Sequence, residues 1–172
     1  MIKIKTLLII SICGLSLIGH SQSAVTMNPL QYVNTFLGVD NWGNVFPGAA
    51  LPFSMVNVSP DIADKQPPSG YLSNKPIIGF SHNHQSGCGM NRGHGNILVM
   101  PQVGALNLHP KEMVKDEIAS PGYYAATFAE SGIRAEVSLS ARCGVHLYTF
   151  KKGQKARILL DVTATRLAGQ SK

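Results

Sequence analysis

Three histidines and a cysteine lie close together in a loop-rich part of the sequence. His82 and His84 stand at the end of a short apolar segment, and Cys88 and His94 follow them. If that segment continues as a strand, both imidazoles of the pair project from one face. Imidazole and thiolate are zinc ligands, but this spacing matches no standard zinc signature. The alternatives are structural hydrogen bonds and donation to the hydroxyls of a sugar.

A second candidate is the loop segment 41–48, which contains the only Trp of the chain with two Asn and two Gly. The indole of Trp42 is the kind of group that packs against the C–H face of a sugar ring, and Asn44 offers both a donor and an acceptor to hydroxyls. Glycine lets the backbone approach a ligand closely. The alternative is a tight turn whose Trp fills the core.

No catalytic pair of carboxylates stands out from the acidic residues. Hydrolysis of a glycoside needs two of them flanking the scissile bond. Asp40 and Asp61 are the acidic residues nearest to the candidate loops. A serine nucleophile elbow, a cysteine–histidine dyad and a phosphate-binding loop are also missing from the sequence.

The elements that would position these groups are mostly strands. Between Ile133 and Ala141, apolar residues alternate with polar ones, as in a half-buried strand: Ile133, Ala135, Val137 and Leu139 share one face. Four strands separated by short turns predict an antiparallel meander over 123–129, 133–141, 145–150 and 156–162. Shorter strands are expected at 56–58, 77–80 and 97–100, and one helical turn within 111–119. The whole predicts an all-β fold, an antiparallel β-sandwich.

Composition narrows the class of protein further. Hydrophobic residues make up 44% and charged residues 14% of the chain, which excludes a disordered protein. The net charge of +6 suggests nucleic acid, but the basic excess lies after residue 130, largely in strands and the 151–155 turn. No stripe of basic residues interleaved with aromatics is present, so we expect no nucleic-acid partner.

Residues 1–23 have the features of a signal peptide. Two lysines precede a short apolar run, and small residues precede Ala24. The run is too short to span a bilayer stably, although a membrane anchor is the alternative. Ile12 before Cys13 disfavours a lipoprotein. We therefore expect an exported chain, periplasmic or extracellular, with one domain over 24–172.

Export also bears on the remaining cysteines. Cys88 and Cys143 could pair in an oxidising compartment, or remain as two reduced thiols. Their separation in the sequence does not give the geometry that a disulfide needs.

A series of motifs extends over nearly all of the segment after the leader. In order along the chain they occupy 32–38, 43–61, 69–71, 78–87, 95–101, 121–124 and 159–161. Their sequences include Phe-Pro-Gly-Ala, Ser-Gly-Tyr and Gly-Phe-Ser-His-Asn-His. This series resembles the start of glycoside hydrolase family 92, which holds calcium-dependent, inverting exo-α-mannosidases of bacteria.

The resemblance implies an N-terminal β-sandwich of the galactose-mutarotase-like, supersandwich type, here incomplete, followed by a helical (α/α)6 domain. In the family, that missing C-terminal helical domain holds the catalytic acid and base and most calcium ligands. We therefore expect no catalytic or metal-binding residue in this chain, and calcium only in the complete enzyme. The implied partners are mannose-containing glycans and the helical domain.

The resemblance also implies which residues of the sandwich face the sugar. They lie in the Phe36–Gly48 loop, at Tyr71 and in the His82–Gly89 loop. The predicted substrate-binding residues are Trp42, Asn44, Phe46, Gly48, Tyr71, His82, His84 and Ser86.

Two departures from the family pattern matter. The segment before Ser69 contains no Trp, and Leu72 follows Tyr71 where members acting on α-1,2-linked mannose have His, so the linkage stays open. Asn96 replaces the usual Asp. The sequence therefore predicts the carbohydrate-binding region of an exported α-mannosidase that degrades glycoprotein glycans, inert on its own. A free-standing carbohydrate-binding module and an inactive fragment are the alternatives.

Overall fold

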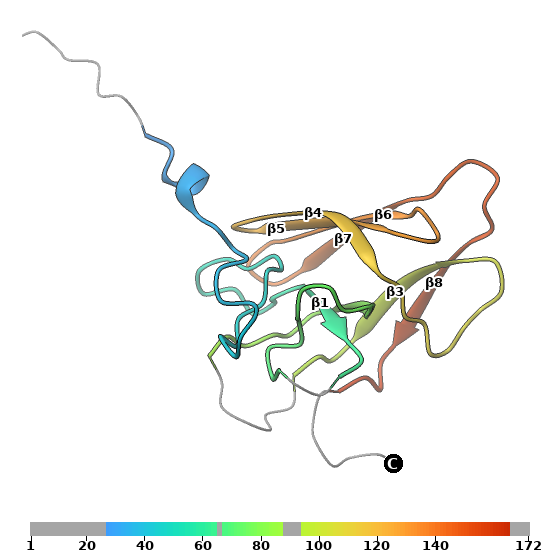
Figure 1. Cartoon of the computed structure of the whole chain (residues 1–172), viewed down its shortest axis with the longest axis horizontal. Coiled ribbons are helices and arrows are strands. Elements are labelled where there is room, and N and C mark those ends of the chain that lie inside the picture. Colours follow the sequence, from blue (N-terminus) through green and yellow to red (C-terminus); the bar gives the residue numbers. More distant parts are fainter. Residues whose placement is uncertain (1–26, 65–66, 88–93, 166–172) are drawn as a thin grey trace, which may run out of the picture.

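The computed structural model describes residues 27–64, 67–87 and 94–165. These residues form eight strands in two four-stranded antiparallel sheets that face each other (Figure 1). The predicted all-β sandwich is therefore confirmed. The predicted signal peptide lies outside the described residues. Among those that are described, no helix has the length and apolar character needed to cross a membrane.

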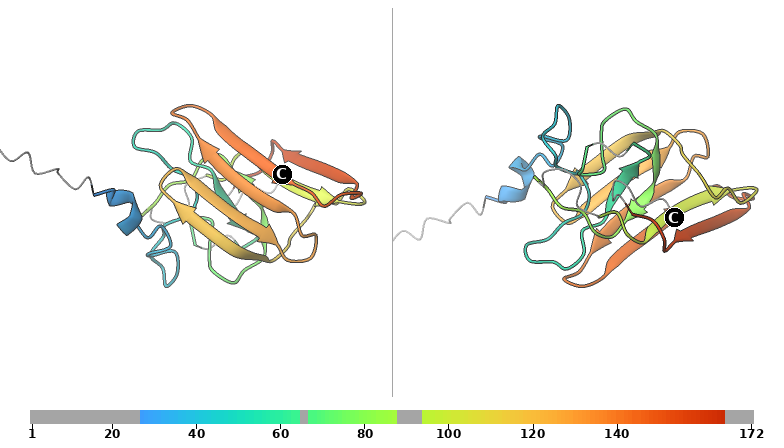
Figure 2. Two further views of the ribbon diagram at one scale, coloured as in Figure 1. Left: turned by 90° about the horizontal axis from the view of Figure 1, so that it is seen from above. Right: turned by 90° about the horizontal axis from the view of Figure 1, so that it is seen from below.

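The first sheet combines three early strands with the last one. Its order is β1 (Ser59–Ile62), β2 (Ile77–Ser81), β3 (Leu98–Val103) and β8 (Ala156–Asp161). Six residue pairs join β3 to β8, and Leu159 of β8 stands opposite Met100 of β3. Figure 2 shows β8 beside β3 at one side of the molecule.

The second sheet follows the chain order. It contains β4 (Val114–Ser120), β5 (Tyr123–Phe128), β6 (Arg134–Leu139) and β7 (Gly144–Thr149). The alternation that predicted the central strand is confirmed, because Ile133, Ala135 and Val137 are all buried against the first sheet.

Two expectations about these elements are wrong. The segment 111–119 forms no helical turn, since β4 pairs with β5 over most of it. A register shift between Lys115 and Ile118, with Asp116 at a φ of 52°, interrupts the alternation that would have marked a strand. The four-stranded meander is also wrong, because β8 leaves the second sheet for β3, where Leu159 packs on the core.

The core lies between the sheets around Phe80, whose ring contacts Tyr124 and Phe128 at centroid distances of 6.0 and 6.3 Å. All three side chains are fully buried. At the end of this core nearest to β7, His146 also lies against Phe80. The core thus extends to the imidazole pair of His146 and His82.

Cys143 is exposed in the turn before β7. Its candidate disulfide partner, Cys88, lies outside the described residues.

Candidate functional site

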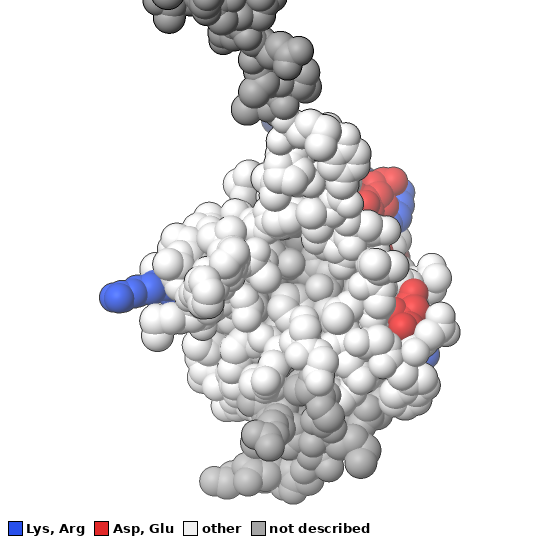
Figure 3. Space-filling model, turned by 90° about the vertical axis from the view of Figure 1, so that its left-hand side faces the viewer, with Lys and Arg blue, Asp and Glu red and all other residues white. Residues whose placement is uncertain are grey.

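The predicted sugar-binding residues come from loops that gather at one end of the sandwich. In Figure 1 this is the left-hand end, where the chain enters through the 3₁₀ turn Pro29–Tyr32 and continues into the loops before β1. Figure 3 faces this end and shows a surface almost free of charged side chains, hollowed at its middle. Such a surface suits a neutral, hydroxyl-rich ligand better than an ionic one.

The loop that carries Trp42 has an unusual backbone. Asn41, Trp42 and Asn44 have positive φ angles of 54°, 66° and 53°. Residues other than glycine adopt this conformation rarely and mostly at functional sites or turns. The Trp42 side chain is 72% exposed, which excludes the interpretation that it fills the core. It borders a pocket of about 270 Å³ with Pro67 and Leu72.

Asn44 lies two residues after Trp42 in the same loop and is half-buried. Its side-chain Oδ1 is buried and accepts no hydrogen bond. Its backbone carbonyl accepts a bond of 2.7 Å from the amide of Gly87, which ties the Trp42 loop to the loop after β2. A buried amide oxygen without a donor costs free energy.

Phe46, Gly48 and Ser86 meet in a second pocket of about 270 Å³, whose other walls include Asn34 and Thr35. Gly48 itself is buried, and a Cβ there would lie 2.2 Å from the carbonyl oxygen of Val58. The glycine is therefore required for packing, whereas the half-buried Phe46 and the exposed Ser86 can present side-chain atoms to a ligand.

His84 lies in the interior. Its side chain is 1% exposed, and its Nε2 lies 3.2 Å from Asp61 Oδ1 and 3.3 Å from Ser81 Oγ. Its Nδ1 donates to the carbonyl oxygen of Asn57 at 3.1 Å. One face packs near Phe46, with ring centroids 5.1 Å apart. In this conformation His84 anchors the loop and is not accessible to a ligand.

His82 is half-exposed, but both of its ring nitrogens have partners. Nδ1 lies 2.8 Å from the carbonyl oxygen of Ile97, and Nε2 lies 2.9 Å from Nε2 of His146 in the opposite sheet. His146 in turn contacts the Tyr148 hydroxyl at 2.8 Å. Burial, and secondarily repulsion by His82, lower the pKa of His146 from 6.5 to about 4.

The three histidines of the zinc hypothesis have different hydrogen-bond partners. His82 bonds to His146, His84 to Asp61, and His94 Nε2 lies 2.7 Å from Gln85 Oε1. Cys88 is outside the described residues. Over 27–64, 67–87 and 94–165, no group of three or more His, Cys, Asp or Glu side chains could surround a metal ion. Calcium in a complete enzyme therefore remains an expectation from the resemblance.

Tyr71 belongs to the core. It is 1% exposed, and its hydroxyl donates to both carboxylate oxygens of Glu117 at 2.9 and 3.0 Å. The Tyr124 hydroxyl also donates to Glu117. Burial, followed by the charge of Glu117, raises the pKa of the Tyr71 hydroxyl above its usual value. The Tyr71 hydroxyl therefore already has a partner in the core and is not available to a ligand.

Asn96 has a structural function that needs an amide. Its Oδ1 accepts from Asn83 at 2.8 Å, and its Nδ2 donates to the carbonyl oxygen of Ala164 at 3.0 Å. A carboxylate could accept the first of these bonds but could not donate the second. Asn96 thus fixes the end of the chain segment after β8 to the loop before β3.

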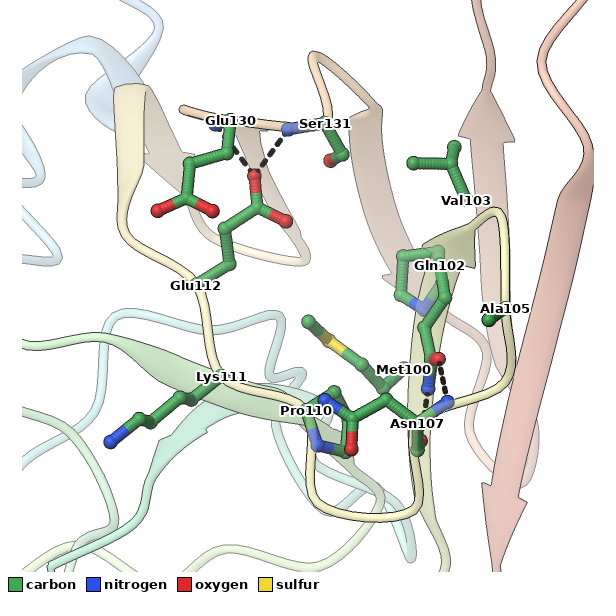
Figure 4. Close-up of a pocket in the computed structure, with 11 residues that line it drawn as sticks. Met100, Gln102, Val103, Ala105, Asn107, Pro110, Lys111, Glu112, Glu130 and Ser131 are labelled. Atoms are coloured by element: carbon green, nitrogen blue, oxygen red, sulfur yellow. Dashed lines mark hydrogen bonds between the residues drawn. The ribbon is translucent and has the colours of Figure 1, made fainter.

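A pocket of about 460 Å³ lies away from all the predicted residues. Figure 4 shows it between β3, the 105–112 loop and the turn at Ser131. Glu112 Oε1 accepts from the backbone amides of Glu130 and Ser131, and Gln102 exchanges two bonds with the backbone of Asn107. These polar groups already hold the pocket's own walls together.

Three residues were not predicted from the sequence: Asn57 and His146, which contact the predicted histidines, and Tyr148, which contacts His146. The alternation within the predicted strand 145–150 places His146 and Tyr148 on one face. Nothing in that alternation indicates that His82, in the other sheet, would meet them.

Comparison with known proteins gives consistent matches. The family model described as the glycosyl hydrolase family 92 N-terminal domain matches residues 32–171. An "uncharacterized secreted glycosidase" of Arthroderma benhamiae is 30% identical over 152 residues, which cover 78% of this chain and 20% of the relative. The chain therefore spans about one fifth of that protein's length.

Solved structures agree with the sequence matches. The family GH92 α-mannosidase BT3965 from Bacteroides thetaiotaomicron, in complex with mannoimidazole, has a TM-score of 0.77 and 33% identity, covering 82% of this chain and 20% of its own. The GH92 family glycosyl hydrolase ccman5 has a TM-score of 0.69 and 27% identity, covering 80% and 21%.

Proposed function

The chain belongs to the glycosyl hydrolase family 92 N-terminal domain family, and on that premise we propose that it is the sugar-facing region of an exported α-mannosidase. The α-mannosidase among the similar structures supports the reaction class. The chain spans about one fifth of that structure. We therefore assign the general acid, the general base and any calcium ion to the part of such an enzyme that this chain does not match.

One observation carries the proposal: the exposed Trp42 on the almost uncharged face of the loop end. An aromatic face is complementary to the C–H face of a mannose unit, and the amide group of the half-buried Asn44 is complementary to one of its hydroxyls. Phe46 and Ser86 border the neighbouring pocket and extend the same surface.

The other predicted residues support this surface from within. His84 and Tyr71 are buried, and Gly48 is held by close packing. For His82, a sugar hydroxyl would have to replace one of two existing hydrogen bonds. We therefore expect direct contact with sugar from Trp42, Asn44, Phe46 and Ser86.

Tryptophan fluorescence tests the proposal, because the chain contains a single Trp. Titration with methyl α-mannoside and with an α-linked mannobiose should change the emission of Trp42 in a saturable way. Asn44→Ala should weaken this binding by at least fivefold, since it removes the amide. Asn107→Ala, at the distant pocket, is the matched control and should leave it unchanged.

A flat titration in the folded chain would reject sugar binding by this region and favour the inactive-fragment alternative. Export is tested separately by mass spectrometry of the protein recovered outside the cytoplasm. We expect its N-terminus at Ala24, after removal of residues 1–23.

A further inference from the structure

We propose that strand β8 pairs edge to edge with β8 of a second copy of this chain, antiparallel and centred on Leu159, so that the chain forms a symmetric dimer. The strand stands at the end of the first sheet, and among the residues that the structure describes only β3 pairs with it. In Figure 1 it lies away from the loop end. The inference is therefore independent of the proposed function.

Strand β8 lacks the features that protect other edges of the two sheets. An exposed edge strand pairs readily with another chain unless a proline, a lysine, a bulge or a cover prevents it. At the opposite end of the first sheet, β1 is fully buried and contains Pro60. In the second sheet, the edge strand β4 has a bulge between Lys115 and Ile118. In contrast, β8 pairs regularly with β3 and contains neither Pro nor Lys, so its second edge is suited to accept a strand.

The backbone groups of Ile158 and Leu160 face this second edge. The amide of Gly104 donates to the carbonyl oxygen of Lys155 at 3.0 Å, so Lys155 and every second residue after it direct their backbone groups toward β3. Ile158 and Leu160 therefore direct theirs away from β3. Pro101, which has no N–H, stands opposite Ile158, as this alternation requires.

The sequence of β8, Ala-Arg-Ile-Leu-Leu-Asp, is complementary to itself in antiparallel orientation. Pairing centred on Leu159 places Arg157 opposite Asp161 of the second copy, and neither forms an ion pair within the part of the chain that the structure describes. The same pairing places Ile158, which is 50% exposed, opposite Leu160, which is 57% exposed. Twofold symmetry makes each contact occur twice. A shift by two residues in either direction would separate Arg157 from Asp161, so the charges fix the register.

The other unprotected edge strand, β7, is a weaker candidate for pairing with itself. It also exposes aliphatic side chains, Val145 and Leu147. However, its sequence contains no Lys, Arg, Asp or Glu, so no opposite charges would fix a register there. An interface built on one strand edge falls in the class below about 1,200 Å², which is typical of weak complexes. We therefore expect the β8 dimer to form reversibly and to depend on protein concentration.

Sedimentation equilibrium of the full chain at increasing concentration tests the proposal, and we expect a monomer–dimer equilibrium. Arg157→Asp and Asp161→Arg each place like charges opposite one another across the two copies of β8. Each substitution should therefore raise the dissociation constant of the dimer at least tenfold. Lys152→Asp makes the same change of charge as Arg157→Asp in the exposed turn before β8. It is the matched control and should leave the dissociation constant unchanged.

Mixing the two charge variants tests the register itself. Arg157→Asp has acidic residues at both positions and Asp161→Arg has basic ones, so an equimolar mixture should form heterodimers about as tightly as the wild type dimerises. Thermal melting confirms that both variants fold before they are compared. The proposal is overturned if the wild type stays monomeric at millimolar concentration, or if the folded variants form no heterodimer. A dimer that survives both single substitutions would place the interface on another face and would contradict it equally.

Discussion

The loop end and the second sheet are ordered by different forces. In the second sheet, buried apolar side chains such as Val137 alternate along paired strands. At the loop end, few residues belong to paired strands. Polar contacts of His84 and the close packing of Gly48 hold these segments together. A few specific polar bonds and close contacts therefore fix the loop end, whereas apolar packing fixes the second sheet.

The largest expected effect concerns the buried pair at the loop end. His84→Ala should lower the free energy of unfolding by about 3–5 kcal/mol, because it leaves the Asp61 carboxylate buried without this partner. Urea denaturation measures the change. His109→Ala, at an exposed histidine, should stay within about 0.5 kcal/mol. If His84→Ala lowered the free energy of unfolding by less than Val137→Ala in the second sheet, the distinction between the two regions would be lost.

A substitution in the second sheet gives the matching value for apolar packing. Val137→Ala should cost about 2 kcal/mol, since it removes two buried methyl groups and leaves a small cavity. The same urea series measures it. If Val137→Ala exceeded His84→Ala, packing rather than the polar pair would dominate stability.

High pH should lower the stability of the fold through Tyr71 and Tyr124, which share Glu117 as a hydrogen-bond partner at the boundary between the two regions. Burial raises the pKa of both hydroxyls above the usual value of 10. Above pH 10 the unfolded chain loses these protons while the folded chain keeps them. The contribution of these two tyrosines to the free energy of unfolding is therefore fully present below pH 10. Above pH 10 the free energy of unfolding falls by up to about 1.4 kcal/mol per pH unit for each tyrosine.

Unfolding free energies between pH 9 and 11.5 check this slope. Tyr124→Phe should make it shallower, whereas Tyr32→Phe, at an exposed tyrosine, should not. Equal slopes for all three proteins would mean that the buried hydroxyls do not control the base sensitivity.

The smallest effect on stability is expected at the surface of the loop end. Asn44→Ala should change the free energy of unfolding by less than about 1 kcal/mol, because the unsatisfied Oδ1 contributes no bond to the fold. Urea denaturation would show it. A loss of several kcal/mol would mean that Asn44 supports the loop instead of serving a ligand.

The sequence could predict the strands and their buried faces where a two-residue period persists, as in β6. It could not predict β4, where a bulge near Asp116 breaks the period, or the pairing of β8 with β3, which is a long-range contact. The same limit applies to the site. Motif spacing identified His82 and His84, but their partners, His146 and Asp61, are distant in the sequence and were found only through the fold.

The central claim is that the loop end, and not the larger pocket near Glu112, faces the sugar. Two-dimensional amide NMR of the ¹⁵N-labelled chain, titrated with an α-linked mannobiose, tests it most directly. The account predicts that the largest shifts occur at the Trp42 indole, Asn44, Ser86 and Gly87. Shifts centred on Asn107 and Ser131, in the pocket of Figure 4, would contradict it.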